Sequence, residues 1–119
     1  MLEFIGPRAF YATGLTTITV PSTVKLIRKV AFKQCGRLAT VTFPSNSVLE
    51  SIGYEAFAFS GLTAITVPST VELIDQEAFK FCKGLKKIVA VSCVSAMTIH
   101  SSAFDYSDGV NYITLRSSP

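Results

Sequence analysis

The sequence of 119 residues has no tryptophan, a single histidine and few charged residues, which make up 16% of the chain. Because roughly a quarter of the residues in an average soluble domain are charged, much of this surface is expected to be neutral. The formal net charge of +3 is a small excess, whereas nucleic-acid binding requires a concentrated basic face. We therefore expect no nucleic-acid partner.

Long apolar segments are missing as well, although 49% of the residues are hydrophobic. Serine, threonine and glycine interrupt each apolar stretch well before the ~20 residues that a membrane-spanning helix needs, so no membrane span is expected. The N-terminal segment, MLEFIGPRAF, also lacks the basic start, the apolar centre and the cleavage site of a secretory signal. We expect a mature, an intracellular or an excerpted chain.

What the chain does have is an internal repeat. The single domain over residues 1–119 divides into a partial unit (1–14), complete units (15–37, 38–61, 62–84 and 85–109) and a terminal strand (110–119). Two of the complete units begin almost identically, as LTTITVPSTVKLI and LTAITVPSTVELI. An Ala-Phe pair follows at the same place in every unit, including the partial one. Self-similarity of this kind predicts a stacked, solenoid-like fold.

The pattern L-x-x-I-x-V-P predicts one strand per unit, because apolar and polar positions alternate and a proline then ends the strand, at Pro21, Pro44 and Pro68. Stacked units would pair these strands in parallel at ~4.8 Å per rung. Asp75 is expected to cap a short helix at the Ala-Phe pair of its unit. The predicted fold is an α/β-repeat solenoid of about five rungs, with one parallel β-sheet, and with short extended segments and one-turn α- or 3₁₀-helices on the other side.

The pattern L-x-x-I-x-V-P, then V-x-x-I, then A-F-x-x-C, resembles the leucine-rich repeats of the BspA-like surface-antigen family over essentially the whole chain. Two places depart from it and predict distorted loops: Val91 replaces the proline, and extra residues stand around 46–48. The resemblance implies a protein-protein interaction module of adhesion or attachment type, at the cell surface or outside the cell. The alternative function is an architectural subunit packed within a larger multiprotein assembly.

No group of residues predicts catalysis, a metal site or a bound cofactor. His100 is expected at a surface turn, and spacing places no base beside any serine. The cysteines, Cys35, Cys82 and Cys93, form no C-x-x-C pair, so neither a zinc site nor a disulfide framework is expected. Cys35 and Cys82 share one repeat position and are predicted as small fillers, whereas Cys93 is either buried or exposed and reactive. We therefore expect no enzyme.

Alignment of the units places residues above one another in columns, and the exposed strand columns are rich in threonine. Such a face either supports strand pairing alone or binds a protein or glycan. These threonines are Thr17, Thr40, Thr19, Thr42 and Thr66. Lys86, Lys87, Asn111 and Tyr112 follow towards the carboxyl-terminal end of the sheet, with Tyr112 aligned to Lys87. Together these residues are the candidate partner-binding surface.

A further column, Phe59, Phe81 and Tyr106, falls on the turn side of the predicted solenoid. These aromatic side chains either pack against each other or project outward as an apolar stripe that docks a partner. The sequence alone allows both arrangements.

The two ends of the array carry apolar residues instead of polar capping repeats. The candidate end-on contacts are Leu2, Phe4, Val110, Ile113 and Leu115. We expect a neighbouring subunit, or further repeats of a longer array, to cover one or both ends. Other proteins are therefore the expected partners.

Overall fold

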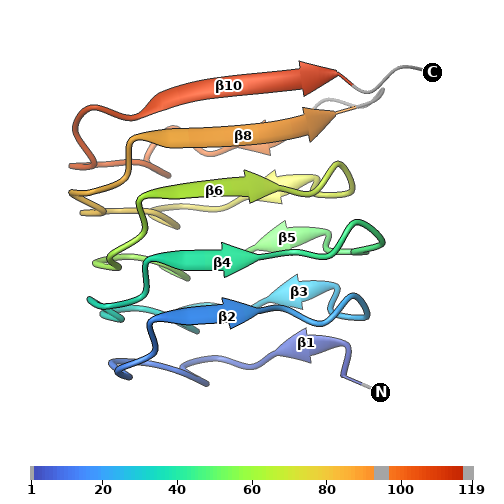
Figure 1. The fold of residues 1–119 in the computed structure, drawn as a ribbon, viewed down its shortest axis with the longest axis horizontal. Helices are drawn as coiled ribbons and strands as arrows, with labels where there is room; N and C mark the ends of the chain where they lie inside the picture. The colour runs from blue at the N-terminus through green and yellow to red at the C-terminus, as the bar shows by residue number, and fades with distance from the viewer. Residues whose placement is uncertain (1, 93–96, 117–119) are drawn as a thin grey trace.

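The chain alternates between two facing stacks of short parallel strands and so forms a solenoid (Figure 1). The structure, a computed structural model, describes residues 2–92 and 97–116, and the side chains of residues 2–90 and 97–110. The front stack consists of β2 (Thr17–Thr19), β4 (Thr40–Thr42), β6 (Ala64–Val67), β8 (Lys87–Ser92) and β10 (Asn111–Arg116). The back stack consists of β1 (Phe4–Ile5), β3 (Leu26–Ile27), β5 (Ser51–Ile52), β7 (Leu73–Ile74) and β9 (Thr98–Ile99).

Parallel pairing within both stacks confirms the predicted solenoid. The back strands form one continuous sheet in the order β1-β3-β5-β7-β9. The predicted short extended segments are therefore strands of a second sheet, because each segment finds its equivalent in the units above and below. In the front stack β2 pairs with β4, and β6 with β8 and β10, but no ladder joins β4 to β6. No described segment is a helix with the length and hydropathy needed to cross a bilayer.

The prediction of one-turn helices at the Ala-Phe pairs is wrong, because the described residues there form successive β-turns. In one unit the N–H groups of Ala31, Lys33 and Cys35 each donate to the carbonyl three residues earlier, at 3.2 to 3.3 Å. The N–H groups between them donate instead to the next unit, as Phe32 does to Ala56 at 2.7 Å. An α-helix would turn every N–H inward along its own axis, so it could not bond neighbouring units in this way.

This alternation requires a left-handed backbone at every second turn. Val30 and Gln34 have φ values of 62° and 61°, and equivalent residues of the other units behave alike. Asp75 also caps a turn and not a helix: its carboxylate accepts the N–H of Gln76 at 2.7 Å, and its carbonyl accepts that of Ala78 at 3.3 Å.

The phenylalanines of the Ala-Phe pairs form a stacked column through the core. Phe32, Phe57 and Phe79 are fully buried, and ring centroids along the column from Phe10 to Phe104 are 5.0 to 5.4 Å apart. Stacked pairs of this kind contribute about 0.5 to 1.5 kcal/mol each beyond the burial of their area. The column therefore links each unit energetically to its neighbours.

The shared position of the cysteines is confirmed as a buried filler position. Cys35 and Cys82 are both free and buried, and their thiols donate to the carbonyls of Phe10 and Phe57 at 3.0 and 3.2 Å. Burial raises the pKa of the Cys82 thiol. These thiols therefore satisfy the backbone of the preceding unit. Cys93, for which two alternatives stood, lies outside the described residues.

The predicted register of the last strand is wrong by one residue. Asn111, and not Tyr112, pairs with Lys87, and Tyr112 pairs with Ile88. The corner before β10 contains Gly109, with a φ of 82°. The strand begins directly after Val110, whereas in the preceding unit Lys86 stands between the equivalent Leu85 and the first strand residue, Lys87. The side chains of Asn111 and Tyr112 lie outside the described set.

Candidate functional site

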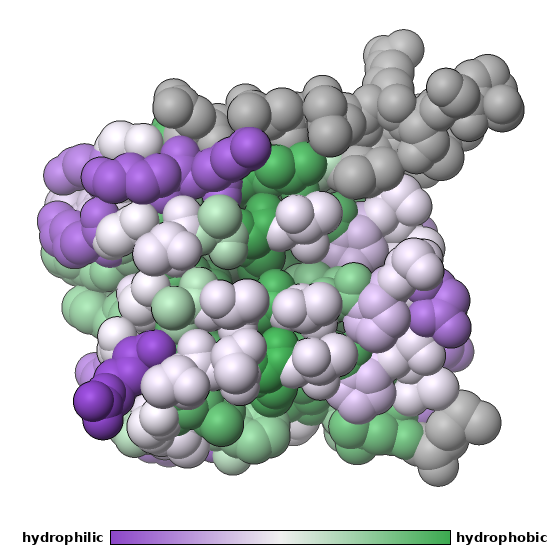
Figure 2. Space-filling model, viewed as in Figure 1, coloured by the Kyte–Doolittle hydropathy of each residue, from purple (hydrophilic) through white to green (hydrophobic). Residues whose placement is uncertain are grey.

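The exposed face of the front sheet carries the predicted threonine columns. Thr17 pairs with Thr40 and Thr19 with Thr42, and all four side chains are exposed, as is that of Thr66 on β6. Figure 2 shows this face as mostly pale, which reflects hydroxyl and small side chains of intermediate hydropathy. No charged residue lies on β2, β4 or β6. The five threonines are therefore brought together on one neutral surface.

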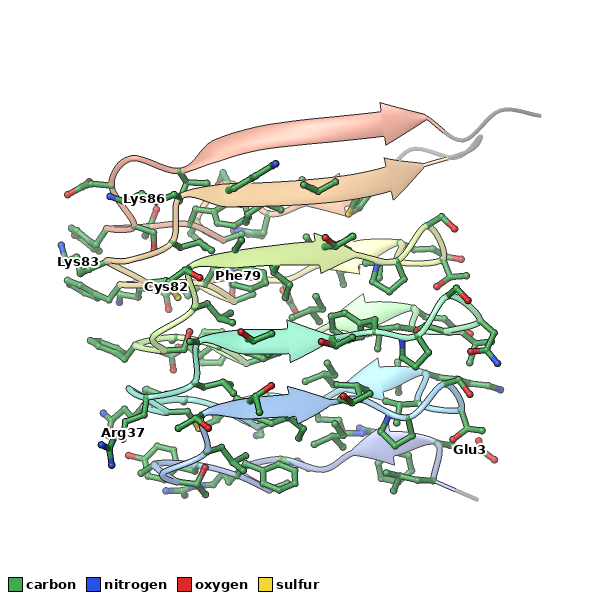
Figure 3. All side chains as sticks on the ribbon, viewed as in Figure 1. Glu3, Arg37, Phe79, Cys82, Lys83 and Lys86 are labelled. Carbon is green, nitrogen blue, oxygen red and sulfur yellow. The ribbon has the colours of Figure 1, made fainter. Side chains whose placement is uncertain are left out.

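The predicted lysines border this neutral surface at the next unit. Lys86 precedes β8 and Lys87 begins it, and both side chains are exposed. Figure 3 places Lys86 with Lys83 and Arg37 along one edge of the solenoid, where the chain enters the front strands. Within the described side chains, Lys86 and Lys87 are the only charged members of the predicted partner-binding surface.

Two hollows lie side by side where the front ladder is interrupted. One, of ≈ 270 Å³, is lined by residues of β4 and β6 and by Phe43. The other, of ≈ 260 Å³, is lined by Phe43, Thr66 and the loops that follow both strands. Phe43 and Thr66 line both, so the hollows form one groove along the sheet face, which we call the β4/β6 groove.

On the turn side, Phe59, Phe81 and Tyr106 stack in a column that we call the aromatic ladder. Ring centroids are 4.9 Å apart for Phe59 and Phe81, and 4.6 Å apart for Phe81 and Tyr106. Phe59 is nevertheless 38% exposed and Tyr106 is 59% exposed. The two arrangements left open by the sequence therefore occur together, because the rings stack face to face while their edges remain in solvent.

All three residues of the aromatic ladder have a left-handed backbone. Their φ values are 60° for Phe59, 55° for Phe81 and 60° for Tyr106. An L-residue in this conformation loses roughly 1 to 2 kcal/mol because its Cβ crowds the backbone. Glycine and asparagine adopt it most easily, yet Ala12 and Gln34 adopt it at the equivalent positions as well, so pairing between units imposes it whatever the residue type.

Lysines and glutamates flank the aromatic ladder. Lys33 pairs with Glu55 at 3.0 Å, and Lys80 pairs with Glu77 at 3.1 Å. The hydrogen bond from Lys80 lowers the pKa of the Glu77 carboxyl, and the same bond raises the pKa of Lys80. The Nζ of Lys80 lies 5.8 Å from the centroid of the Phe81 ring and 5.9 Å from that of Tyr106. The rings are thus held between cations whose own charges are partly neutralised.

Lys83 is the most exposed cation beside the aromatic ladder. Its Nζ lies 5.1 Å from the centroid of the Phe81 ring, within the range of a cation–π contact. Its ion pair with Asp108 is long, at 3.9 Å, and the side chains are 62% and 92% exposed. An exposed pair of this length contributes about 0 to 1 kcal/mol, so Lys83 remains available to a partner.

The structure describes the predicted end-on residues to different extents: the side chains of Leu2, Phe4 and Val110, but only the backbone of Ile113 and Leu115. Leu2 and Phe4, at the β1 end, are 52% and 49% exposed, and the guanidinium of Arg28 lies 4.9 Å from the centroid of the Phe4 ring. Val110 is half-buried and packs against the core. Ile113 and Leu115 lie on β10, where only the backbone is described.

His100 is the centre of a local turn. Its Nδ1 lies 2.9 Å from the hydroxyl of Ser102 and accepts the N–H of Ser102 at 3.2 Å. The Nε2 faces the side-chain amide of Gln76 at 3.3 Å, whereas in the serine-histidine-aspartate triad the serine bonds Nε2 and a carboxylate bonds Nδ1. Spacing did not reveal this Ser-His contact, because the turn itself creates it. Among the described residues, no three His, Cys, Asp or Glu side chains are placed to hold a metal ion.

Comparisons with known proteins agree with this architecture. The family model of the BspA type leucine rich repeat region matches residues 3–119, in six copies. The pneumococcal vaccine antigen PcpA is 29% identical to this chain, with a TM-score of 0.66, over 76% of this chain and 26% of the antigen. No curated protein sequence matches.

Two further solved structures share the fold. A leucine rich cell surface protein from Faecalibacterium prausnitzii A2-165 is 24% identical, with a TM-score of 0.60, over 90% of this chain and 33% of its own. A leucine-rich repeat protein from Bacteroides ovatus ATCC 8483 is 21% identical, with a TM-score of 0.51, over 98% of this chain and 41% of its own. This chain thus spans less than half the length of each structure. The repeat family indicates a protein-interaction module.

Proposed function

Because the chain belongs to the BspA-type leucine-rich repeat family, we propose that it is an attachment module of a surface protein and binds a protein partner through the aromatic ladder. The surface location is supported by its similarity to a pneumococcal vaccine antigen. The observation that carries the binding surface is the exposure of the stacked rings on a left-handed backbone.

The fold does not require the aromatic ladder. The left-handed backbone costs roughly 1 to 2 kcal/mol at each of these positions whichever L-residue stands there, because pairing between units imposes it and Ala12 and Gln34 adopt it too. Two ring stacks return about 1 to 3 kcal/mol beyond the burial of their area, and burial is partial because the ring edges remain exposed. The equivalent positions in the first two units are Ala12 and Gln34, so the fold does not require rings. Selection for binding explains them better.

The chemistry of this surface fits a protein partner with apolar and acidic side chains. Aromatic residues are enriched at protein interfaces, and tyrosine is among the residues that dominate their binding energy. Lys83 provides positive charge beside the aromatic ladder, and Lys86 lies along the same edge of the solenoid as Lys83 (Figure 3). Lys87, and Asn111 at the same register position of β10, continue the proposed surface towards the front sheet, whereas Tyr112 pairs with the buried Ile88.

The test is binding of the purified chain to a panel of extracellular-matrix and host-cell surface proteins, measured by biolayer interferometry. We expect Tyr106→Ala or Phe81→Asn to weaken binding to the captured partner by about tenfold or more, which corresponds to about 1.4 kcal/mol. The matched control is Tyr11→Ala, since Tyr11 is an exposed tyrosine outside the ladder, 37% exposed. Equal binding by all three variants would refute the proposed surface.

A second function, that of an architectural subunit, is favoured by the exposed apolar side chains of Leu2 and Phe4 at the β1 end. This function requires that a second protein, and not further repeats of the same chain, covers that end in a stoichiometric complex. Phe4→Ser would then release the chain from the complex, whereas Tyr106→Ala would leave the complex intact. Sedimentation velocity of the native complex distinguishes the two functions.

A further inference from the structure

A hollow of ≈ 350 Å³ lies on the back of the solenoid, where β3 and β5 lead into the turns. Ser51 stands there in register with Leu26 on one side and Leu73 on the other, so a small side chain replaces a leucine. Two positions further along the chain, Gly53 carries no side chain. This unit therefore fills less space than its neighbours at two nearby positions, and we call the resulting space the Gly53 hollow.

Close approach of two units explains why glycine stands at this position. A Cβ built on Gly53 would lie 2.8 Å from the carbonyl oxygen of Ile27 and 3.0 Å from backbone atoms of Arg28 and Lys29. The N–H of Gly53 donates to that same carbonyl at 2.8 Å. Glycine is favoured where backbones approach this closely. The Gly53 hollow is therefore built into the path of the backbone and does not depend on the position of a movable side chain.

Charges of opposite sign stand on the two sides of the Gly53 hollow. Arg28 and Lys29 line it from the unit nearer β1, and Asp75 lines it from the unit nearer β10. Two rungs separate these units, roughly 9.6 Å at 4.8 Å per rung, so the opposite charges are too far apart to neutralise each other. Within the residues that the structure describes, none of the three side chains forms an ion pair. Arg28 stacks on the Phe4 ring, 4.9 Å from its centroid, which leaves its charge without a counterion.

The carboxylates closest to Tyr54, which also lines the hollow, already have partners. Glu55 and Glu77 both raise the pKa of the Tyr54 phenol, so both lie near it. Glu55 is paired with Lys33 at 3.0 Å, and Glu77 is paired with Lys80 at 3.1 Å. These carboxylates therefore do not compete with a ligand for the cations of the Gly53 hollow.

We propose that the Gly53 hollow binds an extended protein segment that carries an acidic and a basic side chain two residues apart. Side chains at such positions lie on the same face of the segment, roughly 6.6 Å apart at ~3.3 Å per residue. The acidic group meets Arg28 and Lys29, and the basic group meets Asp75, while the backbone of the segment passes over Gly53. A segment with charges of one sign would be attracted by one side of the hollow and repelled by the other. This site goes beyond the proposed function, because it rests on residues outside the aromatic ladder.

The test is titration of the ¹⁵N-labelled chain with capped serine-glycine peptides that carry aspartate and lysine two residues apart, in either order. Peptides with aspartate alone, with lysine alone or with neither are the comparison. We expect an aspartate-lysine peptide to shift the amide signals of Gly53 and Tyr54. At low ionic strength it should bind about fivefold more tightly than either singly charged peptide, and added salt should reduce this difference.

Variants of the hollow separate its charges from its shape. Asp75→Asn keeps an acceptor for the N–H of Gln76 but removes the negative charge, so the aspartate-lysine peptide should bind no better than the aspartate-only peptide. Ser51→Leu restores the residue of the neighbouring units and should fold normally, yet it fills the hollow and should weaken binding of every peptide. The matched control is Glu72→Gln, which removes an exposed carboxylate of the same unit as Asp75 outside the hollow and should change nothing.

Phe81→Asn, on the aromatic ladder, should leave peptide binding unchanged, so the outcome at this site is distinguishable from the outcome at the proposed protein surface. The proposal is overturned if no peptide binds, or if a singly charged peptide binds as tightly as the aspartate-lysine peptide. It is also overturned if Asp75→Asn leaves the difference between the peptides intact, a result that does not depend on how well Ser51→Leu folds.

Discussion

Replacement of Phe81 by Asn tests whether the aromatic ladder exists for the fold or for a partner. The substitution removes two ring stacks, at 4.9 and 4.6 Å, worth about 0.5 to 1.5 kcal/mol each. It also relieves a φ of 55°, which costs a phenylalanine roughly 1 to 2 kcal/mol and asparagine much less. The ring also loses the area that it partly buries, so we expect the free energy of unfolding to fall by about 1 to 2 kcal/mol.

Phe79→Ala is the matched comparison, because it removes a ring two residues away that is fully buried and stacked on both sides. Loss of a buried phenylalanine costs about 3 to 5 kcal/mol, out of a total stability of about 5 to 15 kcal/mol. Urea unfolding of both variants measures the difference. If Phe81→Asn lost as much stability as Phe79→Ala, the ladder would be a structural element and the argument for a docking surface would fail.

Three further predictions concern other parts of the solenoid. Gly61→Ala should destabilise the chain by about 1 to 3 kcal/mol in urea unfolding, because its Cβ would overlap the preceding unit, whereas Gly14→Ala meets nothing within 4 Å and should be tolerated. Lys80 lowers the pKa of Glu77, so their ion pair stabilises the fold above the ordinary carboxyl pKa, and this stabilisation is lost as the pH falls through the lowered pKa of Glu77. Glu77→Gln should therefore lower Tm at neutral pH, and the Tm of this variant should fall less in acid than that of the unmodified chain. Burial raises the pKa of the Cys82 thiol, so its alkylation by iodoacetamide, followed by mass spectrometry, should be at least about tenfold slower in the native chain than in urea.

The solenoid could be predicted because each unit must bury the same side of its chain against the next. Residues at equivalent positions then meet in space, which is why alignment alone placed Phe59, Phe81 and Tyr106 in one column. The same logic failed at β10. A corner that enters the strand one residue early changes every later pairing, and repeat alignment does not detect such a slip.

The turns could not be predicted from residue type. A left-handed backbone is typical of glycine and asparagine, yet here Val30, Glu55 and Phe81 adopt it. The cause is pairing between units: alternate N–H groups must point to the carbonyls of the next unit, as that of Gln34 does to Ala58 at 2.8 Å. The helical propensity of the short segment around each Ala-Phe pair is therefore outweighed by hydrogen bonds that form only between stacked units.

The candidate sites lie where neighbouring units differ, and a physical reason connects the two facts. Stacking requires the same residue type at a given core position of every unit, so a residue that repeats from unit to unit indicates packing alone. An exposed or half-exposed position carries no such requirement. The rings at positions that Ala12 and Gln34 fill elsewhere are departures that the fold does not need, although their stacking adds some stability. In a solenoid, binding is therefore best sought at residues that break the repeat on its surface.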